Sequence, residues 1–350
     1  MQWILYGATG ITGGLITQAA LRRGHRPILA GRNADRVRPL AEQHDLPWRA
    51  VDLADDKALR GLVGSAPLTL LAASPFDSAS LRVAYACIDA GTHYLDLANE
   101  IPVLEALYGL QDLASARKVT VLPGVGFGTV AADTLARHVV ERLPTADVLD
   151  LTIDLYTAGS SPGARGSTLR ALASGAQVLR RGQLTRVGFG SKTAGAFVPP
   201  GARTVVAVPS GELAAVYRTT AVPNISVSRP LSLPHIIARA ALPALAVVAK
   251  SRALQAWVAK RPSNDLPPTD SATKSRVWAR AADPNGQTAL AQLETGEGYT
   301  FSAESAVAAV EAVLDDPVPG AYSPGALLGP DFALRIAGTR RMDAQVRAEA

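Results

Sequence analysis

The 350-residue chain lacks several features that define other classes of protein. Its single cysteine, Cys87, excludes an intramolecular disulfide, and the apolar segment 83–88 around it predicts a core residue rather than a nucleophile. The five histidines do not fall at the spacing of metal ligands. The nearest group, His93 with Asp96 and Glu100, would point apart on a strand and turn, so we predict no metal site.

Blocks of one charge and long hydrophobic runs are also missing. The 35 basic and 30 acidic residues give a net charge of +5, and the arginines are scattered, so we expect no nucleic-acid partner. The most apolar stretch, residues 231–260, is interrupted by Arg239 and Pro243 before it reaches the ~20 residues of a bilayer span, so we expect no transmembrane segment. A strand begins at residue 4, without a signal or transit peptide before it, and a cytoplasmic protein is expected.

The 231–260 segment leaves several interpretations open. A buried packing helix is preferred, but a helix that lines an apolar substrate channel, a homodimer contact and an interfacial helix are alternatives. The polar, proline-rich residues 261–273 predict a mobile loop. We therefore expect a small-molecule substrate, of apolar character if the segment lines its channel, and a homodimer if it forms the contact.

A glycine-rich turn near the N-terminus is the most informative feature present. The apolar strand 4–6 leads into Gly7, Gly10 and Gly13, and a helix and a second apolar strand follow, which predicts a βαβ unit. Gly7 permits a tight turn, Gly10 lets the backbone approach a pyrophosphate, and Gly13 lets the helix lie close to the strand. The free N–H groups at the helix start would face the phosphates. The predicted cofactor contacts here are Gly7, Ala8, Thr9, Gly10, Ile11, Thr12 and Gly13.

The end of the second strand indicates which dinucleotide binds. An NAD site places a carboxylate there, whereas this chain has Arg32 and Asn33 and no acid before Asp35. A guanidinium binds a 2′-phosphate bidentately, so Arg32 favours NADP(H), unless it lies on a merely solvated face. Later strands should add contacts at the same sheet edge. These are Asp52 and Leu53, which alternatively belong to a helix start, and Ala73, Ser74, Pro75 and Phe76.

The chain divides by its patterns into two domains. Residues 1–125 predict an α/β domain with a doubly wound parallel sheet of the Rossmann type, in which the apolar run 68–73 is a buried strand. Residues 126–320 predict an α+β domain with a mainly antiparallel sheet, and the segment from about 321 to 350 is expected to pack back on the first domain. In the second domain we expect a helix over 169–180, a hairpin turn at 283–286 and strands over 151–156, 204–208, 213–219, 275–281 and 287–293.

Seven motifs, taken in order and spacing, resemble the saccharopine dehydrogenase-like family of NAD(P)-dependent oxidoreductases, which includes trans-acting enoyl reductases. They are residues 7–13 (GATGITG), 30–32 (AGR), 74–76 (SPF), 91–97 (GTHYLDL) with Glu100, 123–128 (PGVGFG), 298–300 (GYT) and 323–329 (SPGALLG). The chain departs from the family at Asn99, where glycine is usual, and at Gly128 and Thr129, where an Asp-Ser pair is common. Both departures lie near the expected substrate.

The resemblance implies an NADPH-dependent reductase of a C=C, C=N or C=O bond, with an enoyl, lipid or polyketide-type substrate favoured. An imine or amino-acid reductase of saccharopine chemistry and a non-catalytic NADP(H)-binding sensor or scaffold are the alternatives. Candidate proton donors are Tyr94, Asp96 and Glu100, although Asp96 and Glu100 could instead cap the following helix. The predicted substrate contacts are Asn99, Gly126, Phe127, Gly128 and Thr129.

Overall fold

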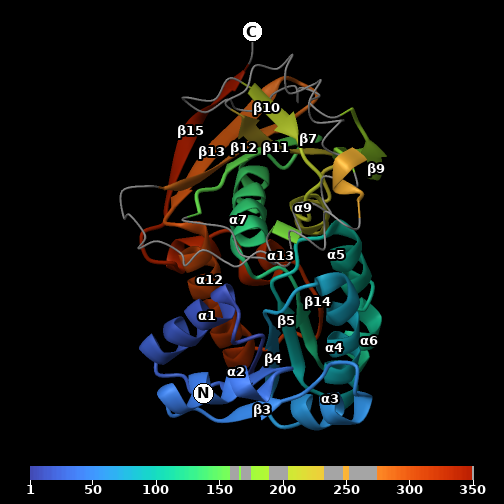
Figure 1. Cartoon of the computed structure of the whole chain (residues 1–350). Coiled ribbons are helices and arrows are strands. Elements are labelled where there is room, and N and C mark those ends of the chain that lie inside the picture. The colour runs from blue at the N-terminus through green and yellow to red at the C-terminus, as the bar shows by residue number, and fades with distance from the viewer. Residues whose placement is uncertain (158–164, 167–174, 189–203, 232–246, 252–273, 349–350) are drawn as a thin grey trace. The chain divides into compact units, whose positions relative to one another are not determined.

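A computed structural model describes residues 1–157, 165–166, 175–188, 204–231, 247–251 and 274–348, and Figure 1 shows them as ribbons. The chain forms two compact units. Unit 1 comprises residues 1–127 and 299–328, and unit 2 comprises residues 128–298 and 329–350. Residues 169–174 of one predicted helix, most of the apolar segment 231–260 and the loop 261–273 lie outside the described residues.

Unit 1 contains a seven-stranded sheet in which every neighbouring pair is parallel. Its order, β14-β6-β5-β4-β1-β2-β3, is the doubly wound order with β14 added at one edge. The strands are β1 (Ile4–Tyr6), β2 (Ile28–Gly31), β3 (Trp48–Ala50), β4 (Leu68–Leu71), β5 (His93–Asp96), β6 (Thr120–Leu122) and β14 (Gly320–Ala321). The predicted Rossmann fold is confirmed, and its chain order reverses between β1 and β4, where such sheets bind their ligands.

Helices cover both faces of this sheet (Figure 1). They are α1 (Ile11–Arg22), α2 (Ala34–Gln43), α3 (Asp56–Val63), α4 (Phe76–Ala90), α5 (Ile101–Tyr108), α6 (Gln111–Ala116), α12 (Gly298–Asp315) and α13 (Pro324–Leu328). Ion pairs from Arg22 and Arg23 to Glu304 hold α1 beside α12. Asn33 caps α2 and Asp55 caps α3 through their side chains, whereas Gly91 ends α4 in the left-handed conformation at φ 70°.

Unit 2 contains a mixed, mainly antiparallel sheet of eight strands, as expected. Its order is β15-β13-β12-β7-β11-β8-β9, with β10 paired to β11, and the β7–β11 pair is parallel. The strands are β7 (Val148–Asp154), β8 (Gln177–Arg180), β9 (Gln183–Arg186), β10 (Thr204–Ala207), β11 (Asn224–Leu231), β12 (Ser275–Ala282), β13 (Gln287–Thr295) and β15 (Arg340–Ala348). In β7, Leu149, Leu151 and Ile153 alternate with Asp150 and Thr152, so the two faces of the sheet differ in polarity.

Two predicted elements of unit 2 are wrong. Residues 213–219 form most of helix α9 (Glu212–Thr220) rather than a strand, because Glu212 with Ala215 and Val216 repeats at helical spacing on the buried face. Residues 177–180 form β8, not the end of a helix, and they turn into β9 through Arg181 and Gly182, both at positive φ. Two consecutive residues at positive φ are typical of a tight hairpin turn.

The ends of the two units differ from the expected division at residue 125. Helix α7 (Phe127–Arg142) begins at the last residue of unit 1 and continues into unit 2. Residues 299–328 return to unit 1, where β14 pairs with β6, but β15 pairs with β13 in unit 2. The C-terminal segment is therefore shared, because both sheets accept a late strand at an open edge. None of the described helices has the length and hydropathy needed to cross a membrane.

Candidate functional site

The glycine-rich turn lies where the chain order of the parallel sheet reverses. Gly7 follows β1 at φ 97°, and its N–H donates to the Ala30 carbonyl at 2.8 Å. A Cβ on Gly7 would lie 2.8 Å from the backbone of Ala72 and Ala73, which follow β4. A Cβ on Gly13 would overlap the Gly7 carbonyl oxygen. The turn is therefore pressed between α1 and the end of β4, as the glycine pattern predicts.

The start of α1 is open, in contrast to this packing. Gly10 is the N-cap residue, is exposed, and supplies no side chain to the helix N–H groups. A Cβ on Gly10 would meet only the Gly7 carbonyl oxygen, at 3.4 Å, so the outer surface of the turn carries backbone alone. Unsatisfied N–H groups at a helix N-terminus attract an anion. This bare backbone fits the pyrophosphate of a dinucleotide.

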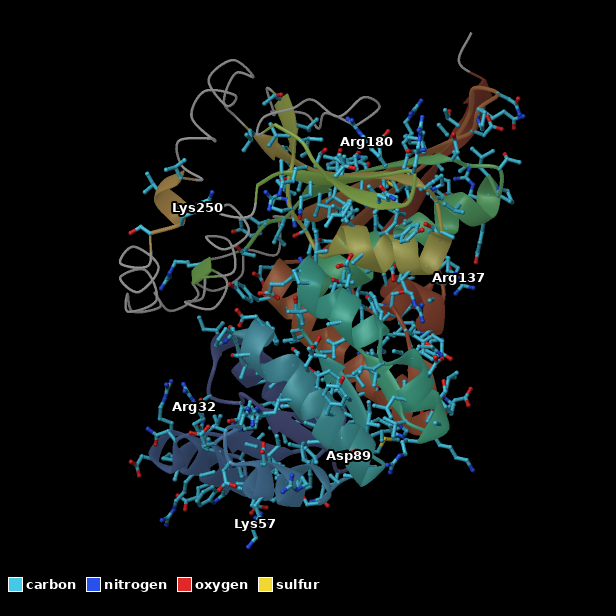
Figure 2. The ribbon with its side chains drawn as sticks, turned by 90° about the vertical axis from the view of Figure 1, so that its right-hand side faces the viewer. Arg32, Lys57, Asp89, Arg137, Arg180 and Lys250 are labelled. Atoms are coloured by element: carbon cyan, nitrogen blue, oxygen red, sulfur yellow. The ribbon has the colours of Figure 1, made fainter. Side chains whose placement is uncertain are left out.

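Two arginines lie at the junction of β2 and α2. Arg32 is exposed directly after β2, and Figure 2 shows it on the outside of unit 1. Arg36, in the first turn of α2, donates from Nη2 to the Thr9 carbonyl at 3.4 Å, which places a second guanidinium beside the glycine-rich turn. Asn33 caps α2 by accepting from the Asp35 N–H at 2.8 Å. The sequence interpretation missed Arg36, because its contact with Thr9 spans 27 residues.

The remaining predicted cofactor residues lie at the ends of β3 and β4. Asp52 is exposed and accepts from the Ala54 N–H at 2.9 Å. Burial raises the pKa of the Tyr6 phenol to about 12, while the positive charge of Arg32 lowers it and the negative charge of Asp52 raises it. Leu53, Ala73 and Ser74 are half-buried or exposed, Pro75 is the N-cap of α4, and Phe76 is its buried first residue.

Asp96, at the end of β5, is the most densely hydrogen-bonded of the candidate residues. Its Oδ2 accepts from the Tyr94 hydroxyl at 2.7 Å and from the Ser80 hydroxyl at 2.9 Å. Its Oδ1 accepts from the N–H groups of Ala98 and Gly124, both at 3.0 Å. Burial raises the pKa of Asp96, and the four hydrogen bonds only partly oppose it. The sequence interpretation missed Ser80 and Gly124 as partners of this carboxyl group.

Tyr94 and Glu100 differ sharply in exposure. The Tyr94 side chain is 0% exposed, and burial together with the Asp96 charge raises its pKa well above the ordinary value. Glu100 is half-buried at the N-cap position of α5, and its side chain does not cap that helix. Its Oε2 instead accepts from the N–H of the exposed Asn99 at 3.1 Å. Of the three candidate proton donors, Glu100 alone reaches the surface.

Hydrogen bonds with α12 hold the second glycine-rich turn, residues 123–128, which follows β6. The Phe127 N–H donates to Ser302 Oγ at 3.0 Å, and the Ser305 hydroxyl donates to the Val125 carbonyl at 2.8 Å. A Cβ on Gly126 would lie 3.6 Å from Leu97, so this turn neighbours the loop after β5. Gly128 is half-buried and Thr129 is buried, and both lie in the first turn of α7. Neither serine was singled out from the sequence.

Cys87 and His93, for which the sequence predicted neither a nucleophile nor a metal ligand, are buried and half-buried, respectively. Cys87 is completely buried, and burial raises the pKa of its thiol to about 12, as suits a core residue. His93 Nδ1 accepts from the Thr120 N–H at 3.0 Å, and burial lowers the pKa of the imidazole. Among the residues that the structure describes, no group of three His, Cys, Asp or Glu side chains is placed to hold a metal.

Comparison with known proteins relates the first part of the chain to a described domain. Residues 3–122 match the family model of the saccharopine dehydrogenase NADP-binding domain. A trans-acting enoyl reductase of Mycobacterium ulcerans is 28% identical over 149 residues, which are 40% of this chain and 35% of that protein. The enzyme of the same description from Mycobacterium tuberculosis is 31% identical over 105 residues, 28% of this chain and 25% of that protein. The matched regions thus span about a third or less of these curated relatives.

A solved structure extends the likeness to the second unit. The apo saccharopine dehydrogenase (L-Glu forming) of Saccharomyces cerevisiae superimposes with a TM-score of 0.62 over 98% of this chain and 100% of that chain. The sequence identity is 13%, so this match concerns the fold alone. The family-model match supports a domain that binds a nicotinamide dinucleotide. The resemblance seen in the sequence is confirmed for residues 3–122, which are similar to the saccharopine dehydrogenase NADP-binding domain.

Proposed function

We propose that the chain is an NADP(H)-dependent oxidoreductase. The observation that carries this proposal is the open, side-chain-free backbone at Gly10. The Arg36 guanidinium contacts the carbonyl of the neighbouring Thr9, and the exposed Arg32 follows the adjacent strand β2. Residues 7–13 would hold the pyrophosphate, and the two arginines would hold the 2′-phosphate of the adenosine ribose. The exposed Asp52 would face the adenine side of the cofactor.

The reaction divides between cofactor and protein. A bound nicotinamide supplies or accepts the hydride. The chain binds and orients the cofactor and the substrate, and it delivers a proton. Glu100 is the proposed proton donor because its carboxyl group is partly exposed at the carboxyl edge of the sheet, whereas Tyr94 and Asp96 are completely buried and bonded to each other. Asn99 and residues 126–129 are the proposed substrate contacts, and residues 74–76 are proposed to contact the cofactor.

The substrate is proposed by class. The names of the mycobacterial relatives favour an enoyl substrate of lipid or polyketide type, reduced at its C=C bond. An imine or amino-acid substrate of saccharopine chemistry, which the resemblance in the sequence implies, is the alternative. NADPH would be mixed with an enoyl thioester, with a 2-oxo acid plus an amine, and with a simple ketone, and cofactor absorbance would be followed. Binding without turnover on all three would favour a sensor or scaffold instead.

Cofactor choice has a separate test. Calorimetric titration of the Arg32→Ala and Arg36→Ala variants should show NADPH binding about 10- to 100-fold weaker, because each loses a charge-assisted hydrogen bond, while NADH binding stays the same. Arg38→Ala is the matched control, since Arg38 lies on the same helix and pairs with Glu42. Equal affinity of the unaltered protein for NADPH and NADH would contradict the proposed cofactor.

A further inference from the structure

The carboxyl group of Asp96 joins four separate parts of unit 1. Ser80 lies on α4, Tyr94 on β5, Ala98 in the loop after β5, and Gly124 in the turn after β6. Asp96 also accepts through its own carbonyl from the Val125 N–H at 2.8 Å. A single residue thus fixes both loops at the carboxyl edge of the sheet.

The hydrogen-bond chemistry leaves this carboxyl group little freedom. An ionised carboxylate offers about four lone-pair sites, and here two hydroxyls and two backbone N–H groups occupy four. A backbone N–H only donates, so Oδ1, which faces Ala98 and Gly124, has no room for a proton. A proton on Asp96 therefore fits only on Oδ2, between the two hydroxyls, and Ser80, Tyr94 and Asp96 are each 0% exposed, so water does not reach it there.

The two loops that Asp96 fixes hold the residues of the proposed function. Ala98 precedes Glu100 by two residues, and Gly124 opens the turn that leads to Gly126. The loops also touch, since a Cβ on Gly126 would stand 3.6 Å from the Leu97 side chain. The spacing between the proposed proton donor and the second glycine-rich turn therefore depends on one buried carboxylate.

We propose that Asp96 is a positioning residue that locks the 97–100 loop to the 123–126 turn and exchanges no proton during turnover. This inference rests on the proposed function for its kinetic consequences. A displacement of about 1 Å at a reacting group lowers the rate about 100-fold. Removing the contacts between Asp96 and the two loops should therefore lower the turnover rate.

Asparagine at position 96 is the discriminating substitution. Its amide oxygen can accept from the Ala98 and Gly124 N–H groups, and its NH₂ can donate to the Ser80 and Tyr94 hydroxyls, which turn to accept. Asp96→Asn should therefore keep kcat within about tenfold and leave its pH profile unchanged, whereas Asp96→Ala should lower kcat/KM about 100-fold. Glu100→Gln should instead lower kcat about 100-fold or more and change the profile.

The controls separate positioning from proton transfer. Asp89→Asn, on the exposed side of α4 (Figure 2), removes a carboxylate without touching either loop and should change nothing. Asp96→Asn that is as inactive as Asp96→Ala, or that loses a limb of the pH profile, would overturn the inference. If Asp96→Ala does not fold, Ser80→Ala, which removes one donor, takes its place with a smaller effect of about tenfold.

A readout without turnover keeps this inference apart from the proposed function. Amide hydrogen exchange at Ala98 and Gly124 should be about 10- to 100-fold faster in Asp96→Ala and near the unaltered rate in Asp96→Asn, because the asparagine retains the acceptor. Unchanged exchange in Asp96→Ala overturns the lock even if the enzyme is active. Faster exchange supports it even if no acceptor is ever reduced.

Discussion

Asp96 in unit 1 and Glu212 in unit 2 are both completely buried carboxyl groups, but their partners differ in kind. The four hydrogen-bond donors around Asp96 are hydroxyls and backbone N–H groups, all neutral. Glu212 faces the Arg229 guanidinium at 3.4 Å and accepts from the Ser210 hydroxyl. Neutral dipoles surround the buried Asp96 carboxyl group, whereas the buried Glu212 is paired with an opposite charge.

The same contrast extends beyond these two groups. In unit 1, the glycine-rich turn depends on close approach of backbone atoms at Gly7 and Gly13. In unit 2, Asp150 is buried beside Ser226 and lies 3.7 Å from Arg280. A site built from dipoles needs its shape preserved, whereas a site built from ion pairs needs its charge preserved. Substitutions that keep shape but remove charge should therefore affect the two units differently.

The largest expected effect comes from breaking the close backbone approach in unit 1. Gly13→Ala should destabilise the protein by about 3 kcal/mol or more and abolish NADPH binding, because the new Cβ overlaps the Gly7 carbonyl and lies 2.8 Å from the Ala8 Cα. Gly14→Ala is the matched control on the same helix, since nothing lies within 4 Å of its Cβ. It should stabilise α1 by up to about 1 kcal/mol. Denaturant unfolding and calorimetry would measure both, and equal behaviour of the two variants would refute this account of the turn.

Close approach of this kind could be predicted because it is encoded locally. Gly7 and Gly13 lie six positions apart, between one strand and one helix, and the apolar run at β4 identifies a buried parallel strand by itself. The Rossmann fold therefore followed from pattern alone. The role of Arg36 was missed for the opposite reason, because its contact with Thr9 spans 27 residues.

The hydrogen bonds inside the candidate site could not be predicted from the spacing of residues in the sequence. Ser80 and Gly124 reach Asp96 across 16 and 28 residues, and Ser302 reaches Phe127 across 175. Such contacts exist only once the sheet has brought the strands together. In unit 2, the predicted strand over 213–219 was wrong because tertiary burial of Glu212 selects the helical repeat over the local apolar pattern.

Breaking the Glu212–Arg229 ion pair of unit 2 should give the next largest loss of stability. Glu212→Gln should destabilise the protein by about 3 kcal/mol, the lower end for a broken buried pair, because the Arg229 side chain keeps 26% of its surface in water. The shape-preserving change in unit 1, Asp96→Asn, should cost about 1 kcal/mol by comparison. Urea unfolding of both variants would measure the difference. If Glu212→Gln costs no more than Asp96→Asn, the contrast between charge and shape does not hold.

A smaller effect should come from removing one dipole near Asp96. Tyr94→Phe deletes the hydroxyl that donates to Oδ2 and leaves Ser80 in place, so we expect a loss of about 1 to 2 kcal/mol in the free energy of unfolding. Tyr85→Phe on α4 is the control, because Tyr85 is 47% exposed and should respond by less than about 0.5 kcal/mol. Thermal unfolding would compare the two, and identical melting temperatures would mean that the phenol contributes nothing to the network.

The smallest effect is the sign of the pH dependence, compared at one carboxyl group of each unit. Burial raises the pKa of Asp96, so the folded state holds its proton more tightly than the unfolded chain does. The stability that Asp96 contributes should fall as pH rises from its ordinary pKa towards the raised one. The loss of unfolding free energy caused by Asp96→Asn is then greatest in acid and becomes smaller towards neutral pH.

Asp283, in the β12–β13 turn of unit 2, should behave in the opposite way. Burial alone would raise its pKa, but hydrogen bonds from Gln287, Thr145 and Asn285 outweigh burial and hold the pKa below its usual value. Its contribution is complete above the ordinary pKa and is lost as pH falls through the lowered one, so the cost of Asp283→Asn should vanish in acid. Urea unfolding of both variants between about pH 3 and about pH 7 should give slopes of opposite sign. Parallel slopes would show that the two carboxyl groups are stabilised by the same means, because only the balance of burial against hydrogen bonding separates them.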